Sequence, residues 1–215
     1  MYRYILFDLD GTLTDSGPGI MNSVAYALSR FGIEATDRAE LSRFIGPPLR
    51  DSFMRYYGFT WEQSDDAIRY YREYYRPTGI FENSVYDGIP ELLRALKEAG
   101  CILIVATSKP EEMAIQVLEH FGLLSCFDYV AGAKLDETRT EKADVIAYAL
   151  ELCPIADKSL AVMVGDREYD ITGAAQNGLD AIGVLFGYGS REELLDVGAK
   201  HLAQTPEDVL RICTE

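Results

Sequence analysis

Residues 4–14 read Tyr-Ile-Leu-Phe-Asp-Leu-Asp-Gly-Thr-Leu-Thr, an apolar run that ends in two aspartates, Asp8 and Asp10. A short apolar run that stops at a turn is typical of a strand buried on both faces of a sheet. Side chains alternate along a strand, so both carboxylates point the same way until the chain turns and can reach one ligand. No EF-hand pattern follows, which argues against a calcium loop. Carboxylates at this strand end therefore predict a functional site.

The rest of the chain alternates between predicted strands and predicted helices. Further β-rich apolar runs occupy residues 101–106, 127–130, 160–164 and 181–185. Between them lie stretches with helical spacing of apolar residues, at 89–99, 111–120, 141–150 and 170–177. Strands that alternate with helices form a parallel sheet with right-handed crossovers. The predicted fold class is α/β, a three-layer doubly wound core with its ligand beyond the carboxyl ends of the strands.

Residues 15–83 interrupt this alternation with helical patterns alone. The predicted helices cover residues 20–31, 38–44, 49–57 and 62–75, with prolines and glycines between or after them. We therefore expect two domains: a core of residues 1–14 and 84–215, and an inserted helical cap of residues 15–83. Because the insertion directly follows the first strand, we expect the cap to open and close over the ligand site.

Composition and charge limit the classes of partner. The 215 residues are 48% hydrophobic and 26% charged, which indicates a globular protein, and no run approaches the length of a membrane helix. The N-terminus reaches an acidic residue too early for a signal peptide, so a cytoplasmic protein without membrane partners is expected. The formal net charge of −15 disfavours nucleic acid as a partner. It also repels anionic substrates, so a phosphate site would need local cations.

The four cysteines, Cys101, Cys126, Cys153 and Cys213, are far apart and form no C-x-x-C pair. Zinc binding is therefore not expected. We expect reduced cysteines in or near the core.

Three more motifs stand in order along the chain, each beside a predicted strand end or helix start. Thr107 follows the strand at 101–106, Lys142 begins a later helix, and residues 165–170 read Gly-Asp-Arg-Glu-Tyr-Asp. With the Asp-x-Asp-Gly-Thr motif, this set resembles the haloacid dehalogenase superfamily, in its phosphatase branch with a helical C1-type cap. The likeness covers essentially the whole chain, and the Gly46-Pro47-Pro48 loop is similar to phosphoglycolate-phosphatase-like and 5′-nucleotidase-like members.

The resemblance implies a Mg2+-dependent phosphomonoester hydrolase that acts through an aspartyl-phosphate. Asp8 would be the nucleophile, and Asp10 would protonate the leaving oxygen and then activate water. Mg2+ would be bound by the Asp8 side chain, the Asp10 carbonyl and Asp166, with Asp170 supporting it directly or through water. Lys142 would pair with Asp8 and a phosphate oxygen, and Thr107 would donate a hydrogen bond to another.

Substrate identity is the least determined part of the prediction. The substrate is expected to be a small phosphorylated metabolite of the phosphoglycolate or 5′-nucleotide type. Candidate substrate-binding residues are Thr107, Ser108, Lys109, Gly46 and Arg50, of which Arg50 could hold a carboxylate in two hydrogen bonds. Gly46 could instead cap the preceding helix. Lys109 and Arg167 could steer the anion, but surface charge is the preferred interpretation.

Single residues distinguish among the other functions that the same motifs could serve. A halide leaving group needs no general acid, so Asp10 argues against a dehalogenase. Phosphonate-cleaving relatives use a lysine of the cap, and residues 15–83 contain none. A hexose-phosphate mutase stays open because its core chemistry is the same. A phospho-accepting signalling domain would gain nothing from Asp10 or a cap. The sequence leaves open a monomer or a homodimer.

Overall fold

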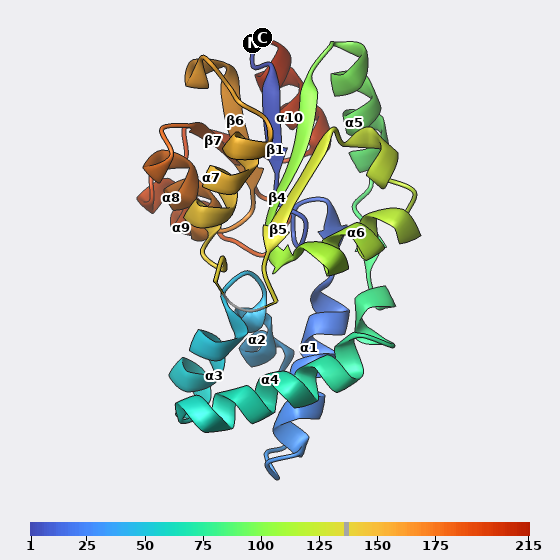
Figure 1. The fold of residues 1–215 in the computed structure, drawn as a ribbon, viewed down its shortest axis with the longest axis vertical. Coiled ribbons are helices and arrows are strands. Elements are labelled where there is room, and N and C mark those ends of the chain that lie inside the picture. Colours follow the sequence, from blue (N-terminus) through green and yellow to red (C-terminus); the bar gives the residue numbers. More distant parts are fainter. Residues whose placement is uncertain (136–137) are drawn as a thin grey trace. The chain divides into compact units, whose positions relative to one another are not determined.

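The computed structural model describes residues 1–135 and 138–215, which divide into two compact units (Figure 1). The first, the core unit, comprises residues 1–14 and 85–215. The second, the helical unit, comprises residues 15–84. Two short strands, β2 (Thr14–Asp15) and β3 (Ser84–Val85), pair where the chain leaves and re-enters the core unit.

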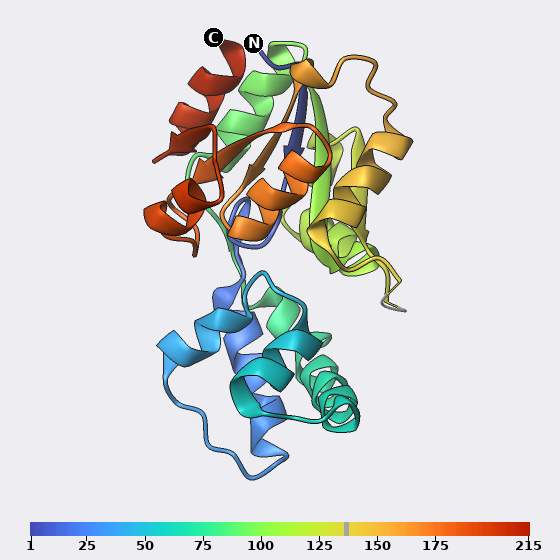
Figure 2. The same cartoon turned by 90° about the vertical axis from the view of Figure 1, so that its left-hand side faces the viewer.

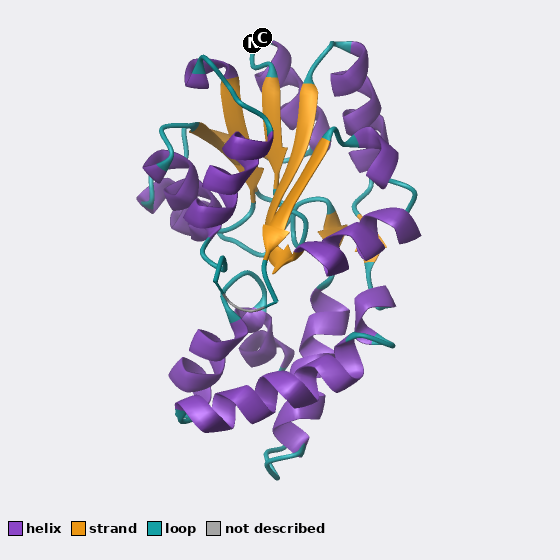
Figure 3. Cartoon of the chain, viewed as in Figure 1, coloured by secondary structure: helices purple, strands orange, loops and turns teal. Residues whose placement is uncertain are grey.

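The core unit is built on a six-stranded sheet in the order β5-β4-β1-β6-β7-β8, with every neighbouring pair parallel (Figure 3). Its strands are β1 (Tyr4–Phe7), β4 (Ile102–Pro110), β5 (Tyr129–Ala133), β6 (Ala161–Gly165), β7 (Asp180–Val184) and β8 (His201–Ala203). The strand order reverses beside β1, which is where ligands bind in open α/β sheets. The predicted α/β fold class, with an inserted helical segment, is confirmed.

Helices cover both faces of this sheet (Figure 2). They are α5 (Ile89–Glu98), α6 (Glu111–His120), α7 (Lys142–Leu152), α8 (Glu168–Gln176), α9 (Arg191–Asp196) and α10 (Pro206–Thr214), with single 3₁₀ turns η3 (Leu124–Cys126) and η4 (Lys158–Leu160). α7 packs on α8, and α5 packs on α10. None of the helices in the described ranges is long and apolar enough to cross a membrane.

Strand β1 lies at the centre because its residues are apolar on both faces. Ile5, Leu6 and Phe7 are fully buried, and Leu6 belongs to the cluster formed with residues of α7, α8 and α9. β1 is paired along its length with β4 on one side and β6 on the other. This double pairing fixes the position of Asp8, the next residue.

The helical unit contains α1 (Gly17–Ser29), α2 (Arg38–Leu41), α3 (Leu49–Tyr57) and α4 (Trp61–Tyr75), with 3₁₀ turns η1 (Ser42–Phe44) and η2 (Gly79–Phe81). α4 packs on both α1 and α3. The interior of the helical unit is aromatic: Phe53 stacks on Phe59 and contacts Phe44 edge-on. Tyr71 and Tyr75 are buried and stacked on each other. These two tyrosines therefore serve packing.

Several boundaries and elements differ from the sequence prediction. α1 begins at Gly17 rather than 20, because Pro18 is well suited to the first turn of a helix. β5 begins at Tyr129 rather than 127; the preceding Asp128 accepts a hydrogen bond from the backbone of Leu103 and pairs with Lys97. β8, α9 and α10 were not predicted. Each is short, between three and nine residues.

The cysteines follow the prediction. All four are free thiols; three are buried and Cys126 is half-buried.

Two adjacent leucines of α9 allow a test of how this helix packs against the sheet of the core unit. Leu194 is fully buried in the cluster that contains Leu6, whereas half of Leu195 is exposed. Replacing Leu194 by alanine removes buried methyl groups and leaves a cavity, so Leu194→Ala should lower the free energy of unfolding by about 2–5 kcal/mol. Leu195→Ala should change it by less than about 1 kcal/mol. Urea denaturation of both variants measures the difference.

Because the two substitutions are identical and lie in the same helix, differences in helix propensity cancel. Equal losses in the two variants would contradict the assignment of Leu194 to the core.

Candidate active site

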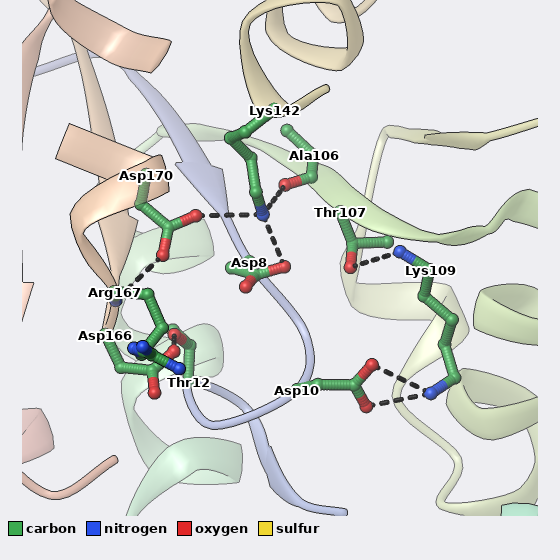
Figure 4. A network of polar contacts seen from close by, with 10 residues as sticks. All are labelled: Asp8, Asp10, Thr12, Ala106, Thr107, Lys109, Lys142, Asp166, Arg167 and Asp170. Carbon is green, nitrogen blue, oxygen red and sulfur yellow. Dashed lines mark hydrogen bonds and ion pairs between the residues drawn. The ribbon is translucent and has the colours of Figure 1, made fainter. Parts of the chain in front are cut away.

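The motifs come together at the carboxyl edge of three adjacent strands (Figure 4). Asp8 follows β1, Thr107 lies near the end of β4, and Asp166 follows β6. Parallel strands in register end at one edge of the sheet, so residues far apart in the chain become neighbours. Lys142 and Asp170 join them from the first turns of α7 and α8.

Lys142 lies between two carboxylates in the interior. Its Nζ is 2.7 Å from Asp8 Oδ1 and 2.8 Å from Asp170 Oδ1, and it donates a hydrogen bond to the Ala106 carbonyl at 3.1 Å. All three charged side chains are buried. Burial opposes the charged form of the lysine, but Asp170 and Asp8 outweigh it and raise the Lys142 pKa. Lys142 is therefore a permanent cation beside Asp8.

Asp166 is the most enclosed carboxylate of the group, with no exposed surface. The backbone N–H of Tyr188 donates to its Oδ2 at 2.8 Å, and the Thr12 hydroxyl donates to its Oδ1 at 3.3 Å. Burial, followed by the charges of Asp170 and Asp8, raises the pKa of Asp166 well above its usual range. Two neutral donors do not offset the cost of burying this charge.

A divalent cation fits the donor set. Asp8, Asp166 and Asp170 are all buried and present carboxylate oxygens within 4.8 Å of one another. Three carboxylates face one ammonium, Lys142, so two negative charges are left uncompensated. Asp8 Oδ1 and Asp170 Oδ1 each contact the Lys142 ammonium, and each carboxylate oxygen keeps a further lone pair. Buried carboxylate oxygens with available lone pairs are ligands of the kind that Mg2+ prefers.

Asp10 points away from Asp8 and toward Lys109 (Figure 4). The Lys109 Nζ lies 2.8 Å from each of the two Asp10 carboxylate oxygens, and only 7% of Lys109 is exposed. The interpretation of Lys109 as surface charge is therefore wrong. A register shift between Thr107 and Pro110 interrupts the end of β4, where the Lys109 side chain lies inside the protein.

Arg167 is likewise no free surface charge. Its Nε lies 2.8 Å from Glu193 Oε1, and its side chain is mostly buried. The carboxylate partner lies in α9, a helix that was not predicted. Because α9 was not predicted, the sequence did not indicate an ion-pair partner for Arg167.

The remaining candidates have local contacts that differ in kind. Thr107 is buried, and its Oγ1 accepts a hydrogen bond from the Lys109 backbone at 3.2 Å; Ser108 is half-buried. Gly46 and Arg50 belong to the helical unit. Gly46 adopts a φ of +105°, just after the turn η1. Arg50 pairs with Asp65 at 2.7 Å and lies over the Trp61 ring. Substrate binding by these residues stays a prediction.

Sequence reasoning missed the segment that encloses Asp166. Residues 186–190, Phe-Gly-Tyr-Gly-Ser, supply the Tyr188 N–H and pass close to Asp166. The available signal was the pair of glycines directly after a predicted strand.

Known proteins resemble the chain over most of its length. A family model described as haloacid dehalogenase-like hydrolase matches residues 5–184. A 5′-nucleotidase from Pseudomonas aeruginosa is 48% identical over 90% of this chain and 87% of that protein. A crystal structure of a predicted phosphatase from Clostridium acetobutylicum is 49% identical, with a TM-score of 0.95 over 99% of this chain and 98% of that one.

Two further relatives differ in name. Tyrosine-protein kinase PtkA from Mycobacterium tuberculosis is 42% identical over 90% of this chain, which spans only 65% of that protein. A phosphoglycolate phosphatase from Mesorhizobium japonicum is 29% identical over 87% of this chain and 84% of that protein. The branch that the motifs predicted, phosphoglycolate-phosphatase-like and 5′-nucleotidase-like, is confirmed.

The buried carboxylates make the stability of the metal-free protein depend on pH. Burial raises the pKa of Asp8 from 3.8 to about 6, against the lowering effect of Lys142. Between these values the folded protein retains a proton that the unfolded chain has released, so the free energy of unfolding falls as pH rises. The full loss from Asp8 is about 3 kcal/mol. Urea denaturation with a chelator at pH 4.5 and pH 7 measures most of it.

Asp8→Asn is the matched reference, because it cannot release this proton while all other titrating groups remain. The pH-dependent loss should be about 2 kcal/mol smaller in Asp8→Asn than in the unmodified protein. Parallel pH profiles for the two proteins would contradict an Asp8 at which the effect of burial exceeds that of Lys142.

Proposed function

The chain belongs to the haloacid dehalogenase-like hydrolase family and is a phosphatase, and we propose that it hydrolyses small phosphomonoesters through an aspartyl-phosphate on Asp8. The observation that carries this proposal is the position of Asp8. It follows the central strand, is buried, and lies 2.7 Å from the permanent cation Lys142. Such a cation stabilises the carboxylate form, which is the nucleophile.

The proposed first step transfers the phosphoryl group to the protein. An Asp8 carboxylate oxygen attacks phosphorus, the bond from phosphorus to the ester oxygen breaks, and Asp10 supplies the proton that this oxygen takes up. Lys142 and the Thr107 hydroxyl stabilise the phosphoryl oxygens as their charge shifts. Asp10 must first separate from Lys109, which binds both of its oxygens in this structure.

The second step releases the phosphate. Water attacks phosphorus, Asp10 takes a proton from that water, and the bond from phosphorus to the Asp8 oxygen breaks. Asp8, Asp166 and Asp170 would hold Mg2+ with help from the Asp10 carbonyl, and the bound cation supplies neutralisation of the carboxylate and phosphate charges. Asp8 returns to its carboxylate form beside Lys142.

A 5′-nucleotide is the substrate class that we favour. The supporting observation is similarity: the nucleotidase relative is 48% identical, against 29% for the phosphoglycolate phosphatase. We propose that the helical unit acts as a cap and provides the selection, through Gly46 and Arg50.

A phosphate-release screen over 5′-nucleotides, phosphoglycolate and sugar phosphates, each with Mg2+, tests this choice. The highest kcat/KM is expected with a 5′-nucleotide. Faster hydrolysis of phosphoglycolate would reject nucleotides, and conversion of a hexose 1-phosphate to its 6-phosphate without phosphate release would identify a mutase.

Replacing the nucleophile tests the covalent step. Asp8→Asn removes the attacking carboxylate and should lower kcat by at least about a thousandfold. Asp10→Asn keeps the nucleophile but cannot transfer a proton, so it should lower kcat while a phosphorylated protein still forms with a substrate whose leaving group needs no proton, such as p-nitrophenyl phosphate. Intact-protein mass spectrometry after rapid acid quench detects the added phosphate.

The exposed Asp196 offers a control, since Asp196→Asn makes the same chemical change away from the site. Its kcat should stay within twofold of the unmodified protein. Normal turnover by Asp8→Asn would exclude the aspartyl-phosphate route.

The cation site can be tested without measuring activity. Asp166→Asn removes one of the two uncompensated charges, so it should raise the Tm of the metal-free protein and abolish most of the rise in Tm on adding Mg2+. Differential scanning calorimetry with chelator and then with millimolar Mg2+ measures both effects. A Tm that rises equally with Mg2+ in both proteins would place the cation elsewhere.

A further inference from the structure

The segment after β7 wraps closely around the residues that follow β6. A Cβ atom added to Gly187 would lie 2.4 Å from the Asp166 Cβ, and one added to Gly189 would lie 1.9 Å from the Asp166 carbonyl oxygen. Only backbone can approach this closely. The Tyr188 N–H between these glycines donates to Asp166 Oδ2. The segment therefore sets the orientation of the Asp166 carboxylate.

Glu193 continues this contact from the first turn of α9. Its Oε1 accepts hydrogen bonds from Arg167 Nε at 2.8 Å and from the Glu168 backbone N–H at 3.0 Å. Its own backbone N–H donates to the Ser190 hydroxyl, the N-cap of α9. One carboxylate thus holds the two residues that follow Asp166, and the helix cap fixes the backbone from which that carboxylate extends.

Arg167 connects Glu193 to a second carboxylate of the cation site. The Arg167 backbone N–H donates to Asp170 Oδ2 at 3.1 Å, while its side chain is held by Glu193. Asp166 precedes Arg167 directly. Arg167, the residue held by Glu193, therefore links the two carboxylates Asp166 and Asp170. A small cation with strict octahedral geometry would require a fixed spacing between these carboxylates.

We propose that Glu193 is a positioning residue for the divalent-cation site, acting through Arg167 on Asp166 and Asp170. The inference rests on the proposed role of these aspartates in binding Mg2+. Residues outside the ligand set that orient the ligands typically change metal affinity by about 10–100-fold when replaced. In this proposal Glu193 acts only through the cation ligands and has no role in proton transfer.

The test compares the Mg2+ dissociation constant, obtained from the dependence of Tm on Mg2+ concentration, which needs no substrate. Glu193→Gln should raise this constant about tenfold. Glu192→Gln, its exposed neighbour in the same turn, removes the same charge and should change it by less than about twofold. At saturating Mg2+, kcat of Glu193→Gln should remain near that of the unmodified protein.

Arg167→Gln distinguishes a positioning role of the Arg167–Glu193 pair from a purely electrostatic effect of the two charges on Mg2+ binding. Loss of a positive charge beside Asp166 would by itself strengthen Mg2+ binding, whereas loss of the Glu193 charge would weaken it. If the pair acts as one positioning unit, both single variants and the double variant weaken binding to a similar degree. Opposite effects of Arg167→Gln and Glu193→Gln would reduce the pair to electrostatics and overturn the proposal.

Three further outcomes are decisive. Equal Mg2+ responses of Glu193→Gln and Glu192→Gln, with the unmodified protein responding to Mg2+, would overturn the role of Glu193 and leave the proposed function intact. No Mg2+ response in the unmodified protein would reject the cation site and the inference with it. Urea denaturation in chelator completes the test: a loss of stability in Glu193→Gln without a change in Mg2+ response would assign the residue to structure alone.

Discussion

The surplus of buried negative charge at the end of β1 is the constraint on which the rest of the structure depends. Asp8, Asp166 and Asp170 lie within reach of one another, and Lys142 compensates only one of them. Such an arrangement is costly without a bound cation, because neither burial nor mutual repulsion favours the ionised carboxylates. A stiff core must hold these groups together, and the doubly paired central strand provides it. In the proposed function, the site exchanges stability of the empty protein for affinity toward cation and phosphate.

The sequence predicted those parts of the site that follow from the sheet. A buried apolar strand that ends in carboxylates can be recognised locally, and four motifs in order identify neighbouring strand ends without any knowledge of contacts. The prediction was wrong for Lys109 and Arg167, because their partners are not local. Lys109 is 99 residues from Asp10, and Arg167 is 26 residues from Glu193. The pattern of charges along the sequence does not indicate which residues so far apart form an ion pair.

The limits of helices and strands likewise could be predicted where the pattern is local and long, and could not where it is short. Long periodic segments such as α5 and α4 were placed within a few residues, whereas β8 and α9 are too short for periodicity to indicate them. The loop after β7 matters chemically through a backbone N–H and two missing side chains. A backbone N–H and a glycine are found throughout proteins, so neither feature indicates a function in the sequence. Substrate choice is hard to predict for a related reason, since we propose that it depends on side chains of the helical unit rather than on the common motifs.

The discontinuous core unit has a consequence for synthesis on the ribosome. The helical unit is one contiguous stretch and can fold as soon as it emerges, whereas β1 pairs with β4 only after roughly 100 further residues have been made and with β6 only after roughly 160. At typical elongation rates this leaves the apolar segment at 4–7 without either partner strand for roughly 5–20 seconds. During that time it is a strand edge that could aggregate. Fast early folding of the inserted helices would shorten the unstructured tether behind β1 and limit its encounters with other chains.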